Sequence, residues 1–359
     1  MVDHPLIDDV GSFPVANLEA FENFYMQAYR FLTKNDVASG LENRGFKNNF
    51  YDPVINSFLM KLETGLDVIN YPQHYSMHDQ FLKPIDQYGD PDDPFLIEKE
   101  KAIIPEVLAI KHYLNTCDLE SLKIPEYSAS RDKILLKACI TGPIELYIKT
   151  ELGFTIYKDV LKNFSKSVNH FAKSAIINND RMETQVIAID EPSLGFITLF
   201  NIEPDEIVEC LDIATEGLDD TIIQIHMHSL RDAEVPLKCK NIDVLTCEYA
   251  SDPTNVIERG LLEKWSKKMR VGVSRTNYNA IIGELYEKGI KIDVNAKLEE
   301  QVKLIDPVEK IKENYQRAIS HYGKENVQFV GPDCGLKSWA PQSLAQHLLK
   351  RVVDSLRDI

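Results

Sequence analysis

TIIQIHMHSLRDAEVPLKCKNIDVLTCEYASDP, residues 221–253, is the stretch that indicates the fold most clearly. Two short runs rich in Ile, Leu and Val, at 222–229 and 242–249, flank a polar connection. Runs of this length and composition are typical of buried β-strands. A strand, a connection and another strand in this order predict two parallel strands of one sheet.

The same order repeats along the chain. Strand-like runs lie at 9–13, 66–73, 134–142, 185–191, 222–229, 242–249, 269–275 and 327–333. Apolar residues recur at helical spacing in segments that include 157–178, 204–215, 302–322 and 341–356. Eight strands without a GxGxxG or GxxxxGK[ST] phosphate loop predict a closed (β/α)₈ TIM barrel rather than an open nucleotide-binding sheet.

We expect a single α/β domain over residues 1–359. The connection at 81–131 contains five prolines and is too long for a plain strand-to-helix loop. It is therefore predicted to form a lid or a side excursion after the second strand.

The composition excludes some functions. The chain carries a formal net charge of −16, with 44% hydrophobic and 27% charged residues. This is typical of a globular protein with a large core, and the acidic charge argues against nucleic acid as a partner. We predict a cytosolic protein without membrane spans, because no secretion signal and no run of 18 apolar residues occurs. The six irregularly spaced cysteines predict free thiols or metal ligands.

Two histidines end the run at 222–229. Side chains alternate along a strand, so His226 and His228 share one face and Met227 points to the other. Such a pair is either a set of structural, hydrogen-bonded histidines or part of a metal site.

A carboxylate and a thiol occupy two further strand ends. Glu248 ends the run at 242–249, while Cys247 faces the opposite way. Cys334 lies in the turn GPDCGL after the last predicted strand. Taken singly, a salt bridge would explain Glu248 and packing would explain Cys334. Together with the two histidines, they offer the N, O and S donors that zinc accepts and predict a zinc site.

Five segments resemble the catalytic barrel of the cobalamin-independent methionine synthase family and its archaeal core-type members. They are VGSFP (10–14), IDEPSLG (189–195), HMHS (226–229), TCEYASDP (246–253) and GPDCGLKSW (331–339). Their order and spacing match along nearly the whole chain. The resemblance, which extends to the uroporphyrinogen decarboxylase-like superfamily, implies a methyltransferase in which zinc binds the sulfur of homocysteine.

The resemblance places the zinc ligands on His226, His228, Glu248 and Cys334. Where the family has HxC, this chain has HxH, so a neutral imidazole replaces a thiolate and the site becomes one charge more positive. A substrate thiol bound there should lose its proton more easily but be a poorer nucleophile. Cys247 is an alternative ligand, although strand alternation argues against it.

The resemblance also implies residues that hold the amino acid. Ser12 of GSFP and Asp190 of IDEP match the family's contacts, and Asp190 would pair with the α-ammonium group. A further acidic contact is expected after the second strand, where this chain has INYPQHYSMHDQF. Gln73 or Tyr71 would stand near its place.

A methylcorrinoid, carried by a protein, is the expected methyl donor. Folate-using members of the family are about twice as long and have a His after the seventh strand, because the leaving folate nitrogen needs a proton. This chain has VGVSRTNYN at 271–279, without a His. A methyl group that leaves a corrinoid cobalt requires no proton.

Two other functions stay open. Transfer to another thiol such as coenzyme M would need a cation for the sulfonate; Arg275 is a candidate, whereas Asp190 would repel it. A zinc hydrolase of a different class would activate water instead, although such enzymes usually carry HxH on the first strand. Methyl transfer to homocysteine is therefore the favoured function.

Overall fold

The computed structural model describes residues 4–34, 37–125, 132–290 and 297–357. Eight strands form one sheet in the order β1-β8-β7-β6-β5-β4-β3-β2, and all of the paired strands are parallel. The strands are β1 (Leu6–Ile7), β2 (Ile69–Asn70), β3 (Ile134–Thr141), β4 (Met182–Asp190), β5 (Ile222–His226), β6 (Val244–Cys247), β7 (Lys268–Ser274) and β8 (Val327–Pro332).

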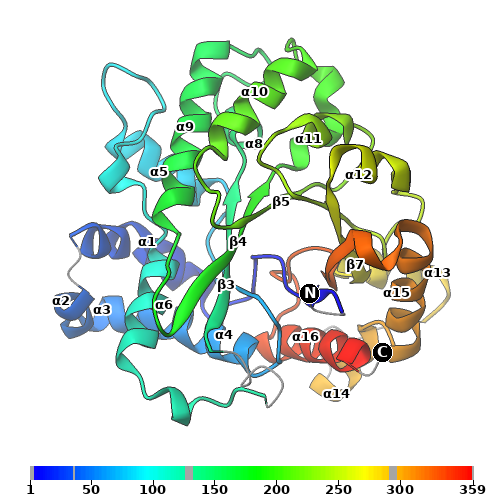
Figure 1. The fold of residues 1–359 in the computed structure, drawn as a ribbon. Helices are drawn as coiled ribbons and strands as arrows, with labels where there is room; N and C mark the ends of the chain where they lie inside the picture. Colours follow the sequence, from blue (N-terminus) through cyan, green and yellow to red (C-terminus); the bar gives the residue numbers. More distant parts are fainter. Residues whose placement is uncertain (1–3, 35–36, 126–131, 291–296, 358–359) are drawn as a thin grey trace.

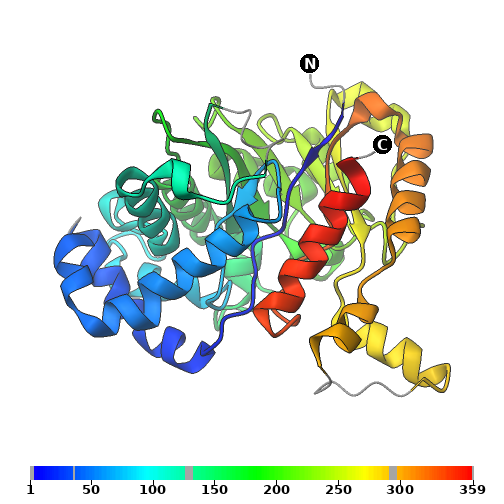
Figure 2. The same cartoon turned by 90° about the horizontal axis from the view of Figure 1, so that it is seen from below.

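Helices surround the strands in a ring (Figure 1). In the first half of the chain they are α1 (Leu18–Thr33), α2 (Val37–Glu42), α3 (Arg44–Phe46), the π-helix η1 (Lys47–Tyr51), α4 (Asp52–Leu62), α5 (Asp79–Tyr88), η2 (Lys99–Lys101), α6 (Pro105–Thr116), η3 (Leu119–Ser121), α8 (Pro143–Ile148) and α9 (Lys158–Ser174). In the second half they are η4 (Pro192–Leu199), α10 (Pro204–Ala214), α11 (Glu234–Lys238), α12 (Arg259–Trp265), α13 (Tyr278–Glu287), α14 (Leu298–Gln301), η5 (Val302–Leu304), α15 (Val308–Tyr322), η6 (Lys324–Asn326) and α16 (Gln342–Arg357). In Figure 2, α13 and α14 project from one end of the barrel.

Contacts between the segments of β1 and β2 close the sheet. Asp8 forms a parallel bridge with Val68, and Ser12 forms one with Gln73. Because β1 also pairs with β8, the strands complete a circle. The predicted (β/α)₈ barrel is therefore confirmed.

The first strand was predicted in the wrong place, because β1 (Leu6–Ile7) lies before the run at 9–13, and β2 (Ile69–Asn70) is shorter than the predicted run at 66–73. A side chain takes over part of their pairing: the Asp9 carboxylate accepts a hydrogen bond from the Asn70 backbone N–H (2.8 Å). The buried ammonium group of Lys61, from α4, lies 2.7 Å from the same carboxylate. The two segments thus stay together through a side-chain clamp, where a regular ladder was expected.

Other boundaries also differ from expectation. The predicted helix at 302–322 is divided into η5 and α15, because the residue before Pro307 cannot easily adopt a helical conformation. The connection predicted at 81–131 contains the end of α5 together with η2, α6 and η3, and α6 packs against α1 and α4. Residues 126–131 lie outside the described part, and the role of this connection as a lid stays a prediction. Within the described ranges, no helix is both long and apolar enough to cross a membrane.

Side chains fill the barrel in layers contributed by alternate strands, as in other TIM barrels. The even-numbered strands supply an apolar layer of Val68, Val186, Val244 and Phe329. The odd-numbered strand segments supply a buried polar layer of Asp8, Lys137, Gln224 and Arg270.

In the polar layer, the Asp8 carboxylate forms ion pairs with both Lys137 and Arg270. Asp8 Oδ2 lies 2.9 Å from Lys137 Nζ and accepts from Gln224 Nε2 at 3.1 Å. Asp8 Oδ1 accepts from Arg270 Nε at 2.6 Å. Burial lowers the pKa of Lys137, and the Asp8 charge opposes this shift.

Asp8→Asn is expected to lower the free energy of unfolding by about 3 kcal/mol or more, because it leaves two buried cations without their counter-charge. Urea unfolding followed by circular dichroism measures the change. Asp354→Asn is the matched control, because Asp354 pairs with Lys350 on the exposed face of α16 and such pairs contribute about 1 kcal/mol or less. If the two substitutions lowered the free energy of unfolding equally, Asp8 would not be the required counter-charge of the buried cations.

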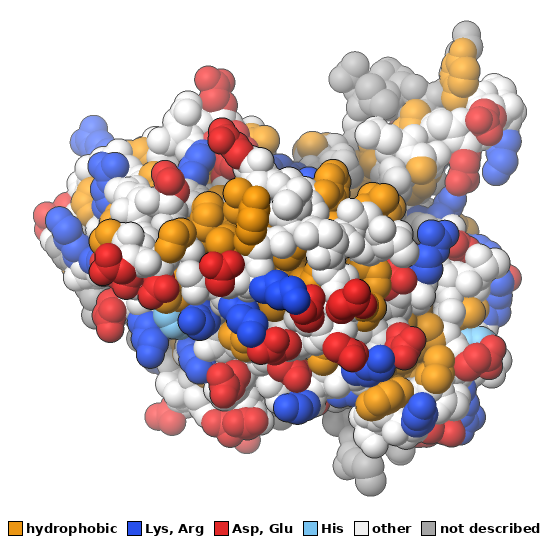
Figure 3. Space-filling view, turned by 90° about the horizontal axis from the view of Figure 1, so that it is seen from above, with side chains coloured by type: hydrophobic (Ala, Val, Ile, Leu, Met, Phe, Trp, Pro, Cys, Tyr) orange, Lys and Arg blue, Asp and Glu red, His pale blue; other side chains and the backbone are white. Residues whose placement is uncertain are grey.

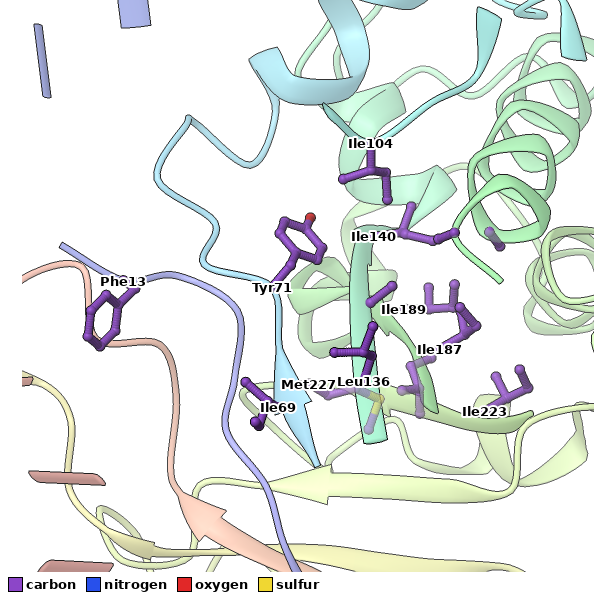
Figure 4. Close-up of a cluster of buried hydrophobic side chains, with 14 of the residues drawn as sticks. Phe13, Ile69, Tyr71, Ile104, Leu136, Ile140, Ile187, Ile189, Ile223 and Met227 are labelled. Carbon is purple, nitrogen blue, oxygen red and sulfur yellow. The ribbon is translucent and has the colours of Figure 1, made fainter. Parts of the chain in front are cut away.

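The outward side chains of the same strands pack against the helices (Figure 4). Ile187 and Ile189 of β4 belong to this core, and so does Met227, which follows β5. Strand alternation therefore turns Asp190, His226 and His228 toward the barrel interior.

Candidate metal centre

Four side chains from three strand ends converge at the barrel mouth. The potential ligand atoms of His226, His228, Glu248 and Cys334 all lie within 4.8 Å of one another. Cys334 Sγ is 3.5 Å from His226 Nε2 and 3.9 Å from His228 Nε2. The Glu248 carboxylate lies 3.6 Å from His228 Nε2. The structure thus brings together the four predicted ligands.

Three of the distances between these atoms are close to those in a tetrahedral zinc site. Zinc bonds of about 2.0–2.3 Å to N, O and S place neighbouring tetrahedral ligand atoms about 3.3–3.8 Å apart. The three distances of 3.5, 3.6 and 3.9 Å are close to this range. Two imidazoles, a carboxylate and a thiol are also ligands that zinc accepts. The residues present therefore fit the metal.

The four side chains of the cluster differ in exposure. His226 is buried, whereas the side chains of His228 and Glu248 are 53% and 24% exposed. A substrate would approach from the side of His228 and Glu248. That Glu248 would be the ligand to move when a substrate thiol arrives stays a prediction.

Asp333 joins two of the ligand loops. Its buried carboxylate accepts hydrogen bonds from the backbone N–H groups of Ala250 (3.0 Å) and Ser251 (2.7 Å) and from the Ser251 hydroxyl (2.6 Å). The segment after Glu248 is thereby held against the segment that carries Cys334. Burial raises the pKa of Asp333 to about 7, although these hydrogen bonds oppose the shift.

The loop that carries Cys334 is fixed from two other directions. The Cys334 backbone N–H donates to Thr276 Oγ1 at 3.1 Å. Ser12 lies so close to Gly335 that a Cβ atom there would be 1.9 Å from the Ser12 hydroxyl oxygen. Glycine is therefore required beside Cys334, and Ser12 lies against this loop; its contact with a substrate stays a prediction.

Burial sets the protonation of two of the candidate ligands. It lowers the pKa of His226 well below its usual value, and the nearby His228, Arg270 and Lys137 lower it further. The neutral imidazole, which is the form that binds metal, is thus favoured. Burial likewise raises the pKa of the Cys334 thiol, with Glu248 adding to the shift, so metal binding would release a proton.

Asp190 lies beside the cluster at the end of β4 and pairs in register with His226. Burial raises its pKa to about 6, while the charge of His228 opposes the shift. Within the described ranges, the carboxylate has no hydrogen-bond partner. It is therefore available for a cationic group of a ligand, and its role as the partner of an α-ammonium group stays a prediction.

Gln73 is engaged away from the cluster. Its amide nitrogen donates to Gln80 Oε1 at 2.8 Å, and Gln80 donates to buried Glu106 (3.2 Å). The hydroxyl group of Tyr71 donates to the Cys139 carbonyl at 2.7 Å. The structure shows neither side chain in the place of an acidic contact, and Gln73 as a substrate ligand stays a prediction.

Two residues were alternatives for ligand binding, Arg275 for a sulfonate and Cys247 for the metal, and both have other contacts in the structure. Arg275 donates to Asp306 from Nε (3.0 Å) and Nη2 (2.8 Å), and its Nη1 donates to Glu284 (3.0 Å). It is therefore not free to bind a sulfonate. Cys247 is buried in the main core, where its thiol lies beside Tyr322, and burial raises its pKa to about 12.

Sequence reasoning missed a second cluster near Asp190. His78 Nε2 lies 2.7 Å from the Glu145 carboxylate, which also accepts a hydrogen bond from the Ser193 hydroxyl. The sequence signal was present, because His78 stands in INYPQHYSMHDQF and Ser193 in IDEPSLG. Glu145 comes from a third loop, so only the folded chain shows the association.

Two curated proteins are similar to this chain. A methionine synthase from Thermoplasma acidophilum is 26% identical over 243 residues, which cover 64% of this chain and 65% of that protein. One from Sulfolobus acidocaldarius is 24% identical over 232 residues, covering 62% and 56%. The similarity spans less than two thirds of either relative. No family model matches the chain.

Solved structures share the fold over almost the whole chain. A B12-independent methionine synthase from Shewanella sp. W3-18-1, in complex with selenomethionine, superposes with a TM-score of 0.59 at 14% identity and covers 99% of this chain and 97% of its own. A methyltransferase from Methanosarcina mazei gives 0.55 at 13% identity, with 100% and 95% covered. With the curated relatives, these structures confirm the resemblance drawn from the sequence motifs.

Proposed function

We propose that this chain, a relative of the methionine synthases with the barrel of the B12-independent enzymes, is a methyltransferase that converts homocysteine to methionine at a zinc ion. The observation that carries the proposal is the convergence of His226, His228, Glu248 and Cys334, whose potential ligand atoms all lie within 4.8 Å of one another. The unbonded carboxylate of Asp190 beside them provides a place for an amino acid.

Four of the site residues would hold the metal, and two others would bind the amino acid. A zinc ion held by the four ligands would stabilise the substrate thiol as a thiolate, the form that attacks a methyl group. Asp190 would accept the α-ammonium group and orient the sulfur toward the metal. Ser12 would contact the substrate from the loop beside Cys334.

Asp190→Ala is expected to raise the KM for homocysteine about 10-fold or more while the zinc content stays unchanged, because a charged hydrogen bond to the ammonium group is lost. Steady-state kinetics at saturating donor, with metal analysis of the same samples, measure both quantities. 4-Mercaptobutyrate, which lacks the ammonium group, is the matched control and should show little change. An unaltered KM for homocysteine would remove Asp190 from the binding site.

The methyl donor we propose is a methylcorrinoid carried by a partner protein. Its support comes from the residues after β7 and not from the comparisons, since the Shewanella enzyme is described as B12-independent. Arg275 is held by two carboxylates, Thr276 supports the Cys334 loop, and Asn277 caps α13. None of them is placed to protonate a leaving nitrogen, whereas a departing cobalt needs no proton.

A further inference from the structure

We infer that Thr246 and Arg270 hold a buried water molecule that supports the metal ligand His226 from inside the barrel. Thr246 is then a positioning residue of the metal centre. This inference rests on the zinc site of the proposed function. A histidine that binds a metal donates the N–H of its second ring nitrogen to a carboxylate, a carbonyl group or water, and this partner fixes the orientation of the ring.

The His226 ring has one nitrogen on the metal side and one that is buried without a partner. Nε2 faces the cluster, because it lies 3.5 Å from Cys334 Sγ. Nδ1 is fully buried and makes no hydrogen bond with any residue that the structure describes. On the outer surface, where Lys and Arg side chains lie among Asp and Glu (Figure 3), water can satisfy such groups. His226 Nδ1 needs a partner inside the barrel instead.

Thr246 and Arg270 face the same interior space from the next two strands. His226 of β5 pairs in register with Thr246 of β6, and Thr246 pairs in register with Arg270 of β7. Paired residues of parallel strands share a face, and Arg270 faces inward because it binds Asp8. Thr246 Oγ1 and Arg270 Nη1 are also fully buried and have no hydrogen-bond partner within the described ranges. Three neighbouring strands thus each present one unpartnered polar atom to the barrel interior.

One water molecule matches these three atoms in reach and in hydrogen-bonding capacity. Neighbouring strands lie about 4.8 Å apart, and two hydrogen bonds of about 2.8 Å that meet at one oxygen span this gap. A buried water needs two to four polar partners. Its oxygen would accept from His226 Nδ1–H and Arg270 Nη1–H, and one of its protons would go to Thr246 Oγ1. The proton on Nδ1 leaves the Nε2 lone pair free for the metal.

Substitution of Thr246 tests the inference through the affinity for zinc, measured by competition with a chelator of known affinity. Thr246→Val removes the hydroxyl group and should weaken zinc binding about 10-fold or more, whereas Thr246→Ser should stay within about twofold of the unmodified protein. Thr221→Val is the matched control. The Thr221 hydroxyl donates to the Leu218 carbonyl (2.9 Å) just before β5, at the end of the strand opposite His226, so its loss should leave zinc affinity unchanged.

Two further measurements separate positioning from general damage. Urea unfolding of the metal-free variants measures stability alone, and Thr246→Ala repeats the test if the valine variant unfolds. With cobalt(II) in place of zinc, the visible absorption bands report ligand geometry; they should change in Thr246→Val and return in Thr246→Ser. Unchanged zinc affinity in Thr246→Val, or an equal loss in Thr221→Val, would overturn the inference while the zinc site stands. If the unmodified protein binds no zinc that depends on Cys334, the proposed metal site is wrong and the role of Thr246 falls with it.

Discussion

Cys334→Ala is expected to reduce bound zinc from about one ion per chain to a trace, because it removes the only thiolate from a set of four ligands. Cys334 lies at the centre of the cluster, 3.5 Å and 3.9 Å from the two imidazole nitrogens. The remaining three ligands include the half-exposed His228, which cannot hold the ion firmly by itself. Metal analysis after dialysis against a weak chelator measures the loss.

Three further variants separate the metal site from general damage. His226→Ala should also lose the ion, whereas Cys247→Ala should retain it, because Cys247 lies in the core away from the cluster. His228→Cys should keep both zinc and fold, because a thiolate at this strand position restores the HxC pattern of the family. Full zinc retention in both Cys334→Ala and His226→Ala would refute the assignment.

With homocysteine as acceptor, a methylated corrinoid protein is expected to support rapid formation of methionine, and 5-methyltetrahydrofolate none above background. The residues after β7 offer no acid for the folate nitrogen, since Arg275 is held by Asp306 and Glu284. Free methylcobalamin should serve weakly, because a carrier protein adds binding energy that orients the cobalt–methyl bond. Methionine is measured by mass spectrometry with each donor in turn.

This assay tests the proposed donor and the proposed acceptor separately. Efficient turnover with the folate alone would contradict the corrinoid proposal. Methylation of coenzyme M, but not of homocysteine, would refute only the acceptor. Heat-inactivated protein and zinc-free protein are the controls for spontaneous transfer.

Much of the fold follows from local patterns in the chain. The alternation of apolar strands with amphipathic helices specifies parallel pairing, because each strand must return to the same edge of the sheet. Strand alternation also separates His226 and His228 from Met227, since successive side chains point to opposite faces. The four candidate metal ligands could be named before any coordinates, because each stands at or directly after the end of a predicted strand.

The sequence was less informative where side chains replace backbone pairing. The Asp9 carboxylate accepts a hydrogen bond from the Asn70 backbone, so β1 ends before the predicted run at 9–13 and β2 is shorter than the run at 66–73. Pro307 likewise interrupts a segment with continuous helical periodicity. In both cases one residue changes the secondary structure that the pattern of the neighbouring residues predicts.

Tertiary structure alone decided which charged groups meet. Asp333 accepts hydrogen bonds that join the loops of Glu248 and Cys334, and Arg275 pairs with Asp306. His78 pairs with Glu145, which lies 67 residues further along the chain. Closure of the barrel sets these pairings, because it fixes the register between strands and brings loops from distant parts of the chain to one mouth. Local periodicity determines which face a side chain occupies, but its partner depends on how the whole chain closes.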